Sequence, residues 1–235
     1  MNKRIASFLI LILVPLHTFA ANQFVIISSN VESLNPGDTV KADQSLDLSE
    51  GQSVKLLSAS GEVITIEGAQ KNLLDRGQNI GDSKLLDAIS RLLKSSSTSD
   101  SALAVYRGGG APNAHAQSVP VDSSGNVCLT DQSSPNFWWP NPVKGMKIDI
   151  SHSPSGERAS ITWASKKKRQ PWPQALPIIQ GDEYQIEVEL SRHIHRFTLL
   201  MIPSSISKPL ERVVWMSNNG CERQALSLLS SLTNN

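Results

Sequence analysis

Several features that would define a function are scarce or absent in this sequence. The net charge is only +1, so composition gives no reason to expect binding to nucleic acid. No Gly-x-Ser-x-Gly turn is present, and the glycines at 108–110 are not followed by the Gly-Lys-Ser/Thr of a phosphate-binding loop. After the first twenty residues, no apolar run is long enough to cross a bilayer. We therefore expect no cofactor and no transmembrane segment in the mature chain.

The N-terminus has the order of a secretory signal peptide. Lys3 and Arg4 precede an apolar run at 8–16, and small residues ending in Ala20 follow it. The run is too short to span a membrane, which distinguishes a signal peptide from an anchor. We expect cleavage after Ala20 and a periplasmic or secreted protein. Loss of the two cations leaves a net charge of about −1.

Composition divides the chain into two β-rich parts separated by a Ser-, Gly- and Ala-rich stretch. The predicted organisation is a signal peptide at 1–20, a small β-domain with an amphipathic helix at 21–98, a flexible linker at 99–120, and a β-sandwich with C-terminal helices at 121–235. The predicted fold class is mainly β with helices, an α+β protein.

The first part contains short strands separated by turn residues. Strands are predicted at 24–27, 45–48, 54–57 and 63–66, and Ser60-Gly61 forms a hairpin turn between the last two.

Glycines punctuate this part with a regular rhythm. The stretches at 37–40, 46–48, 51–56 and 61–66 read GDTV, LDL, GQSVKL and GEVITI. Over residues 36–68 this rhythm resembles the periplasmic FecR-like β-domain. The resemblance implies a small β-solenoid or sandwich of the kind used in envelope signalling.

An amphipathic helix is predicted after these strands. Asp82 or Ser83 is placed to cap it, and one face carries apolar residues at three-and-four spacing: Leu85, Leu86, Ile89, Leu92 and Leu93. A stripe this narrow requires a partner surface, and we expect the helix to lie on the first β-domain.

The second part is built around an alternating strand at 184–191, where Tyr184, Ile186 and Val188 alternate with polar residues. Further strands are predicted at 127–129, 146–150 and 195–202, and another around Ile161.

Helical sequence follows these strands. Pro209 is placed to open a helix that Gly220 ends, and a second helix at 222–232 carries Leu226 and Leu229 on one stripe. We expect this helical pair to close the β-sandwich.

Cys128 and Cys221 are the only cysteines. In an exported chain a disulfide between them is the simplest account, tying an early strand of the second part to its last helix. With about 94 residues enclosed, loop-closure entropy gives roughly 4 to 5 kcal/mol. The alternative is a reactive thiolate on Cys221 at a helix N-terminus.

The strongest local concentration of charge is a run of four cations closely followed by an indole: Lys166, Lys167, Lys168, Arg169 and Trp172. Cations beside an indole can bind an anionic polymer, a phosphate-bearing lipid head group or an acidic protein patch. The alternative is a solvated loop whose indole folds back onto the edge of the sheet.

His193 and His195 are the candidates for a metal site, since two residues on the same face of a strand can share one ion. A third ligand is required, and nothing places His152 near them. The neighbouring Arg192 and Arg196 disfavour a bound cation, so no metal site is predicted.

All five tryptophans lie in the second part. Trp163 and Trp215 are predicted to be core residues. Trp138 and Trp139 are left open between the core and an exposed shelf on which sugar rings stack.

These observations predict a non-catalytic exported envelope protein. It would act as an interaction or sensory-accessory module that binds a protein partner or an anionic envelope polymer. The alternative is a secreted hydrolase with its active site in the C-terminal domain. No residue stands out for that role, because residues 153–156 have the composition of an ordinary turn, and Glu187 and Glu189 are simply two apart on a wet strand face.

Overall fold

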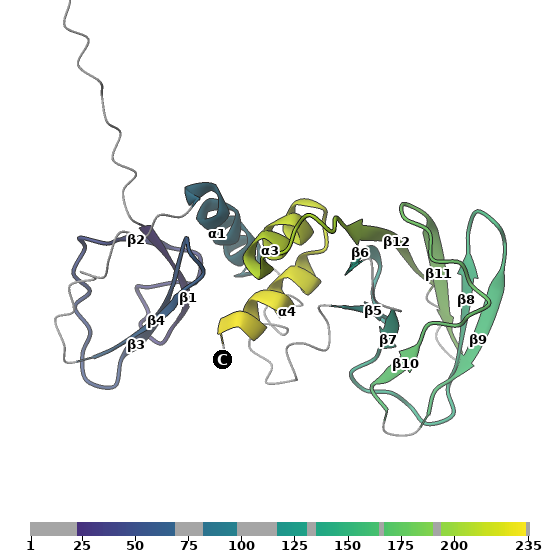
Figure 1. Ribbon diagram of the computed structural model, residues 1–235. Coiled ribbons are helices and arrows are strands. Elements are labelled where there is room, and N and C mark those ends of the chain that lie inside the picture. The colour runs from purple at the N-terminus through teal and green to yellow at the C-terminus, as the bar shows by residue number, and fades with distance from the viewer. Residues whose placement is uncertain are drawn as a thin grey trace, which may run out of the picture.

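The computed structural model describes residues 23–68, 82–97, 117–130, 135–164, 167–189 and 194–233. The described chain is mainly β with helices, which confirms the predicted α+β class. A four-stranded sheet lies at one end, helices occupy the middle, and two further sheets lie at the other end (Figure 1). The predicted signal peptide at 1–20 lies outside the described residues.

The first sheet consists of antiparallel strands in the order β2-β1-β3-β4. Their bounds are β1 Gln23–Ser29, β2 Thr39–Lys41, β3 Ser53–Ser58 and β4 Val63–Glu67. Three of the four predicted strands are confirmed. The strand predicted at 45–48 is wrong, because only an isolated bridge forms there, at Leu46, and the chain pairs with β1 earlier, through β2. Leu46 and Leu48 are nevertheless buried, so their alternation reflects burial without strand pairing.

A tight turn joins β3 and β4 at the predicted position. Gly61 adopts a φ of +92°, a left-handed conformation that favours glycine over other residues. Its N–H donates to the carbonyl of Ser58, and Ser58 N–H donates to the carbonyl of Glu62 at 2.9 Å. The turn sequence therefore fixes the register of the hairpin.

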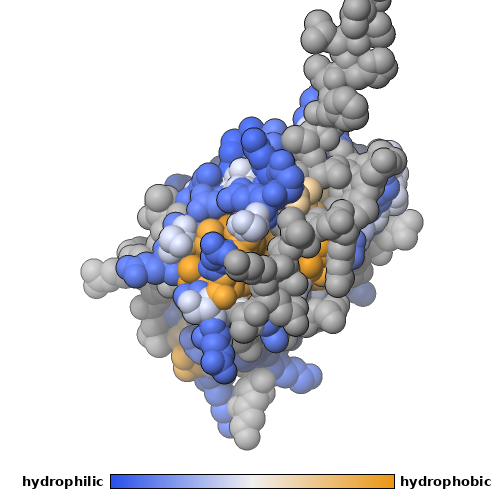
Figure 2. Space-filling view, turned by 90° about the vertical axis from the view of Figure 1, so that its left-hand side faces the viewer, coloured by the Kyte–Doolittle hydropathy of each residue, from blue (hydrophilic) through white to orange (hydrophobic). Residues whose placement is uncertain are grey.

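Strand β1 is buried on both faces. Phe24 and Ile26 belong to an outer core with residues of the neighbouring strands and loops: Val40, Leu46, Leu48, Val54, Leu56, Ile64 and Ile66. Figure 2 views the molecule from the end that holds this sheet and shows apolar side chains gathered there among hydrophilic ones. Val25 and Ile27 point instead into a core shared with the helices. A strand covered on both sides requires a continuous apolar run, which is what 24–27 provides.

Helix α1, Ser83–Ser97, packs on β1 as predicted. A carboxylate oxygen of Asp82 accepts a hydrogen bond from the N–H of Lys84 at 2.9 Å, so Asp82 is the capping residue. Leu86, Ile89 and Leu93 are at most 2% exposed and belong to the same core as Val25.

The second β region contains two sheets. The five-stranded sheet has the order β6-β12-β11-β8-β9, and the three-stranded sheet has the order β10-β7-β5. The bounds are β5 Ser118–Pro120, β6 Gly125–Thr130, β7 Asn136–Trp138, β8 Lys147–His152, β9 Arg158–Thr162, β10 Arg169–Pro171, β11 Glu183–Val188 and β12 Ile194–Ile202. All pairs are antiparallel except β6 with β12 and β5 with β7.

Both of these sheets contribute to one apolar cluster, here called the second core: Val119, Val121, Val127, Leu129, Phe137, Ile148, Ile150, Trp163, Trp172, Leu176, Tyr184, Ile186, Val188, Phe197 and Leu199. The predicted alternation of β11 is confirmed, since Tyr184, Ile186 and Val188 are buried while Glu183 and Glu187 are exposed. The closed sandwich itself stays a prediction.

Part of the predicted linker is structured. Residues 99–116 lie outside the described residues, but Ser118–Pro120 forms strand β5 beside β7. The prediction of a linker up to residue 120 is therefore wrong at its end. Ser118 and Val119 are buried, and Val119 belongs to the second core, which explains why this segment is held in a sheet.

The C-terminal helices are α3, Pro209–Asn218, and α4, Glu222–Thr233. Pro209 opens the first, and Gly220, with a φ of +75°, lies between them as predicted. Their buried face contributes to a cluster here called the shared core: Val25, Ile27, Leu57, Leu86, Ile89, Leu92, Leu93, Cys128, Ile202, Leu210, Val213, Met216, Cys221, Ala225, Leu226 and Leu229.

The expectation that this pair closes the second β region is wrong in its main contact. Leu226 and Leu229 share their core mostly with the first sheet and α1, while Cys128 and Ile202 join it from the second β region and Leu200 packs against it. The helices thus lie between the two β regions (Figure 1). The reason is that α1 packs on α3 and α4 as well as on β1, so that the apolar faces of the helices share one core.

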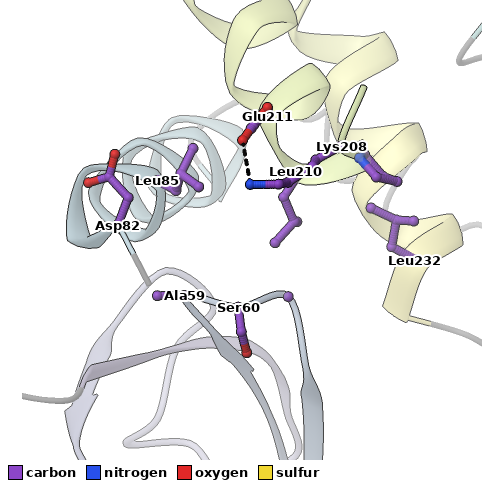
Figure 3. A pocket seen from close by; sticks show the side chains of 10 residues that line it. Ala59, Ser60, Asp82, Leu85, Lys208, Leu210, Glu211 and Leu232 are labelled. Atoms are coloured by element: carbon purple, nitrogen blue, oxygen red, sulfur yellow. Dashed lines mark ion pairs between the residues drawn. The ribbon is translucent and has the colours of Figure 1, made fainter. Parts of the chain in front are cut away.

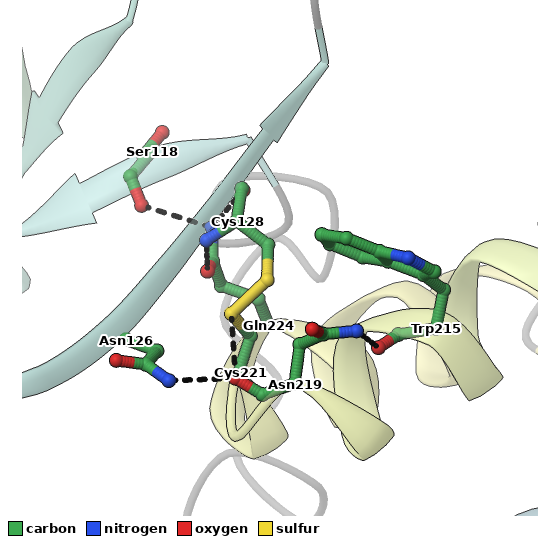
Figure 4. The surroundings of a disulfide bond; sticks show 7 residues. All are labelled: Ser118, Asn126, Cys128, Trp215, Asn219, Cys221 and Gln224. Atoms are coloured by element: carbon green, nitrogen blue, oxygen red, sulfur yellow. Dashed lines mark hydrogen bonds between the residues drawn. A yellow bond between two sulfur atoms is a disulfide. The ribbon is translucent and has the colours of Figure 1, made fainter. Parts of the chain in front are cut away.

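A disulfide holds the helical pair to strand β6, as predicted. Cys128 and Cys221 are bonded, with their Cα atoms 6.0 Å apart and both side chains at most 2% exposed. Beside the bridge, the Gln224 amide accepts from the N–H of Cys128 at 2.7 Å and donates to its carbonyl at 2.8 Å (Figure 4). Asn126 donates to the carbonyl of Asn219 at 2.8 Å. The turn between α3 and α4 is therefore anchored at several points.

Candidate binding surface

The predicted basic loop lies against an aromatic segment of the chain. The N–H of Trp139 donates to the carbonyl of Lys168 at 2.9 Å, and the indole N–H of Trp163 donates to the carbonyl of Lys167 at 2.5 Å. Trp163 is only 1% exposed and belongs to the second core, which confirms its prediction as a core residue. Two hydrogen bonds from tryptophan residues thus fix the backbone that carries the cations.

A second loop reaches the same place. The N–H of Gly145 donates to the carbonyl of Trp163 at 3.1 Å, and Trp163 N–H donates to the carbonyl of Met146 at 2.7 Å. These bonds place the loop at 139–146 beside the basic run. Lys144 is on this loop and is exposed. Cations from two segments of the sequence therefore gather at one end of the second β region.

Acidic residues are missing from both segments. None occurs at 132–148 or at 158–181. Lys167 and Lys168 are exposed, and neither they nor Lys144 form an ion pair with any residue the structure describes. Within the described ranges, no ion pair therefore neutralises these three charges. Arg169 is also exposed, whereas Lys166 lies outside the described residues.

Lys147, at the start of β8, differs from these lysines. Its ammonium lies 3.2 Å from the Asp149 carboxylate, and its backbone N–H donates a hydrogen bond to the Glu189 carboxylate. A hydrogen bond from Ser160 lowers the pKa of Asp149, and the Lys147 ammonium acts in the same direction. Lys147 therefore belongs to a neutralised part of the sheet and is not counted in the surface.

Trp172 is a correction to the predicted set of binding residues. Its side chain is 7% exposed, stacks on Phe137 with ring centroids 5.1 Å apart, and meets Tyr184 edge-on at 5.3 Å. Its indole N–H donates to the carbonyl of Leu176. Trp172 therefore fills the second core and is not available to a ligand. The local sequence showed only that an indole follows the cations, not which way it points.

Trp139 is the indole that remains at the surface. It is partly exposed and meets Trp163 edge-on, with centroids 5.4 Å apart, whereas Trp138 is 7% exposed. This separates the two residues that the sequence left open. We define the basic surface as Lys144, Lys167, Lys168, Arg169 and Trp139. The remaining tryptophan, Trp215, is half-buried against the shared core.

The histidines give no second site of this kind. His193 lies outside the described residues, and His195, on β12, is partly exposed and pairs with Ile186 across the sheet. Within the described ranges, no three His, Cys, Asp or Glu side chains are grouped as metal ligands.

His152 makes contacts that the sequence did not indicate. It is 2% exposed, its Nδ1 lies 2.7 Å from the Ser155 hydroxyl, and its Nε2 lies 2.8 Å from the Asp182 carboxylate. A serine, a histidine and an aspartate that contact one another in series resemble the catalytic triad of a hydrolase. This arrangement is therefore the strongest support for the hydrolase alternative.

Its details favour an anchoring role instead. The Ser155 hydroxyl lies beside His152 Nδ1 but also donates to the Glu157 carboxylate at 3.0 Å, so a second partner holds it. The N–H of Gly156 is bonded to the His152 carbonyl and that of Glu157 to the Ser155 hydroxyl, so neither is free to stabilise an oxyanion. The cluster ties the turn after β8 to the start of β11.

Tyr184 completes this buried group. Its ring lies 4.9 Å from the His152 ring, and its hydroxyl donates to the carbonyl of Pro177 at 2.8 Å while accepting from the N–H of Ile179. Burial raises the pKa of the Tyr184 hydroxyl, which keeps it protonated as a donor. Its partners are backbone groups, as expected of a structural tyrosine.

A groove of about 930 Å³ lies where the helices meet the first sheet (Figure 3). It is formed by the β3–β4 turn, the starts of α1 and α3, and the end of α4. Leu85, Leu210 and Leu232 line it, while Asp82 and the Lys208–Glu211 ion pair, 3.1 Å long, supply charges of both signs. Because the groove carries charges of both signs, it favours neither anions nor cations. The basic surface favours anions and is therefore the more selective of the two.

Comparison with known proteins adds no assignment: no protein-family model, no curated protein and no solved structure matches the chain. The function is therefore argued from the basic surface itself.

Proposed function

We propose that this chain is a non-catalytic interaction module, exported to the periplasm or secreted, that binds an anionic envelope polymer through the basic surface. The observation that carries the proposal is the gathering of exposed cations on two hydrogen-bonded segments that contain no acidic residue. Local charge of one sign raises the concentration of an oppositely charged partner and speeds its association.

The rest of the chain supports this location. A signal-peptide-like N-terminus and a disulfide suit an oxidising compartment. No helix in the described ranges is long and apolar enough to cross a membrane. The FecR-like glycine rhythm at 36–68 adds the proposal that the first β region serves envelope signalling as an accessory module.

The backbone of the basic surface is already held in place before a ligand arrives. The carbonyls of Lys167 and Lys168 accept hydrogen bonds from Trp163 and Trp139, so the backbone at these two residues does not need to be ordered on binding. A polymer suits the surface because the charges are spread over two loops.

The test compares two double variants with the same change in net charge. Lys167→Gln/Lys168→Gln removes charge from the basic surface, and Lys41→Gln/Lys84→Gln removes it from exposed positions on β2 and α1. Binding of the full chain to polygalacturonate and to polyphosphate is measured by isothermal titration calorimetry at low salt. We expect about tenfold weaker binding for the first variant and little change for the control.

Salt provides an independent readout. Binding through exposed charges should weaken steeply as ionic strength rises, because the Debye length falls to about 8 Å at physiological salt. Equal effects of the two double variants, or no binding to either polymer at low salt, would refute the proposed function.

A further inference from the structure

We infer that the polymer bound by the basic surface is an acidic polysaccharide and that Trp139 selects it by contacting a sugar ring. This inference rests on the proposed function and adds the class of ligand. It draws on a feature that charge alone does not require, a partly exposed indole fixed beside the lysines.

Trp139 is held in a defined position. Its backbone N–H is bonded to Lys168, and its ring meets the buried ring of Trp163 edge-on at 5.4 Å. The indole also packs against the second core, but part of it remains exposed, since the side chain is only partly buried. A ligand contact on this ring therefore costs little conformational entropy.

The polar end of this indole is also available. Among the residues that the structure describes, none accepts a hydrogen bond from the Trp139 indole N–H, whereas Trp163 and Trp172 each donate theirs to a carbonyl. A buried indole usually finds an acceptor for this proton, so a surface indole with a free donor suits a partner that brings acceptors. Sugar hydroxyls are acceptors of this kind.

A polysaccharide with acidic groups offers every element that this surface can bind. Its carboxylates or sulfates pair with Lys144, Lys167 and Lys168, the C–H face of a sugar ring packs on the indole, and its hydroxyls accept from the indole N–H. Polyphosphate and polyglutamate match the charge but have no ring to place on Trp139. The combined surface therefore favours the polysaccharide over other polyanions.

The experiment compares three probes at equal charge concentration and equal salt: polygalacturonate, polyglutamate and vesicles of phosphatidylglycerol. We expect the full-length protein to bind polygalacturonate about tenfold more tightly than polyglutamate, as one aromatic contact provides. Trp139→Leu should remove this advantage and bring the affinity for polygalacturonate down to that for polyglutamate. Trp139→Phe, which keeps a ring but loses the N–H, should retain part of it.

The controls separate folding from binding. Thermal melting of both Trp139 variants checks the second core, and their binding to polyglutamate reports whether the lysines remain in place. Equal affinity for polygalacturonate and polyglutamate, with no effect of Trp139→Leu, would overturn the polysaccharide while leaving polyanion binding intact. Tighter binding to the vesicles than to either polymer would overturn it in favour of a lipid surface. Absence of binding to every probe would overturn the proposed function as well.

Discussion

The two β regions differ in how they bury their strands and in the charge that they present. The first sheet is completed by helices from both halves of the chain, whereas the second β region encloses a core made by its own two sheets. Residues 21–98 carry ten acidic and seven basic residues, while 121–235 carry ten acidic and twelve basic ones. In the second region basic residues outnumber acidic ones by two, which is fewer than the four cations at 166–169 alone. The two regions thus differ in that the first shares its core with the helices, whereas the second carries the exposed cations of the proposed binding surface.

The largest expected change in stability comes from removing the disulfide that joins the second β region to the C-terminal helices. Replacing Cys128 and Cys221 by serine should lower the free energy of unfolding by about 4 kcal/mol, because the bridge closes a loop with a sequence separation of 93. Urea denaturation measures this change. Reduced wild-type protein serves as the control and should match the double variant. Two thiols that react in the native protein would contradict the bridge.

The next effect tests whether the first region depends on the C-terminal helices. Leu229→Ala, in the shared core, should lower the free energy of unfolding by about 3 kcal/mol, and Ile186→Ala, in the second core, by a similar amount. Hydrogen exchange distinguishes the two variants. Leu229→Ala should speed exchange in β1 and α1, whereas Ile186→Ala should speed it first in β8 and β11. Faster exchange in α3 and α4 alone would show that the first region does not depend on them.

The smallest effect concerns acid stability in the second region. The pKa of Asp149 is lowered in the folded protein, mainly by Ser160, so its contribution to stability is present above the unfolded pKa of about 3.9 and is lost as the pH falls through the folded value. Ser160→Ala should raise the pKa of Asp149 and make stability less sensitive to pH below about 4. Carboxyl NMR titration measures the change. An unaltered pKa in the variant would exclude Ser160 as its main cause.

Local patterns in the sequence predicted local structure well. The alternation at 184–188, the capping aspartate at 82 and the glycine turn at 61 each depend on neighbouring residues, and all three are confirmed. The disulfide was predictable because the chain contains only two cysteines. The three local features depend on interactions within a few residues, and the two cysteines allow only one intramolecular pairing.

Partners across the chain were harder to predict. The stripe of Leu226 and Leu229 indicated which face of the helix is buried but not what covers it, and the covering surface comes largely from residues before 98. The same limit applies to the tryptophans. Trp138 and Trp139 are adjacent, identical side chains, so the sequence alone did not show that the first is buried and the second partly exposed.

The contacts of Gln224 have a consequence for how the protein behaves among its own copies. β6 is an edge strand of the five-stranded sheet, and an open edge offers unpaired N–H and C=O groups to a strand of another molecule. At Cys128 both groups are already taken by the side-chain amide of Gln224, which imitates a neighbouring strand. The disulfide holds the start of α4, and hence this amide, in place. The disulfide therefore helps to keep in place a side chain that occupies backbone groups on this part of the sheet edge.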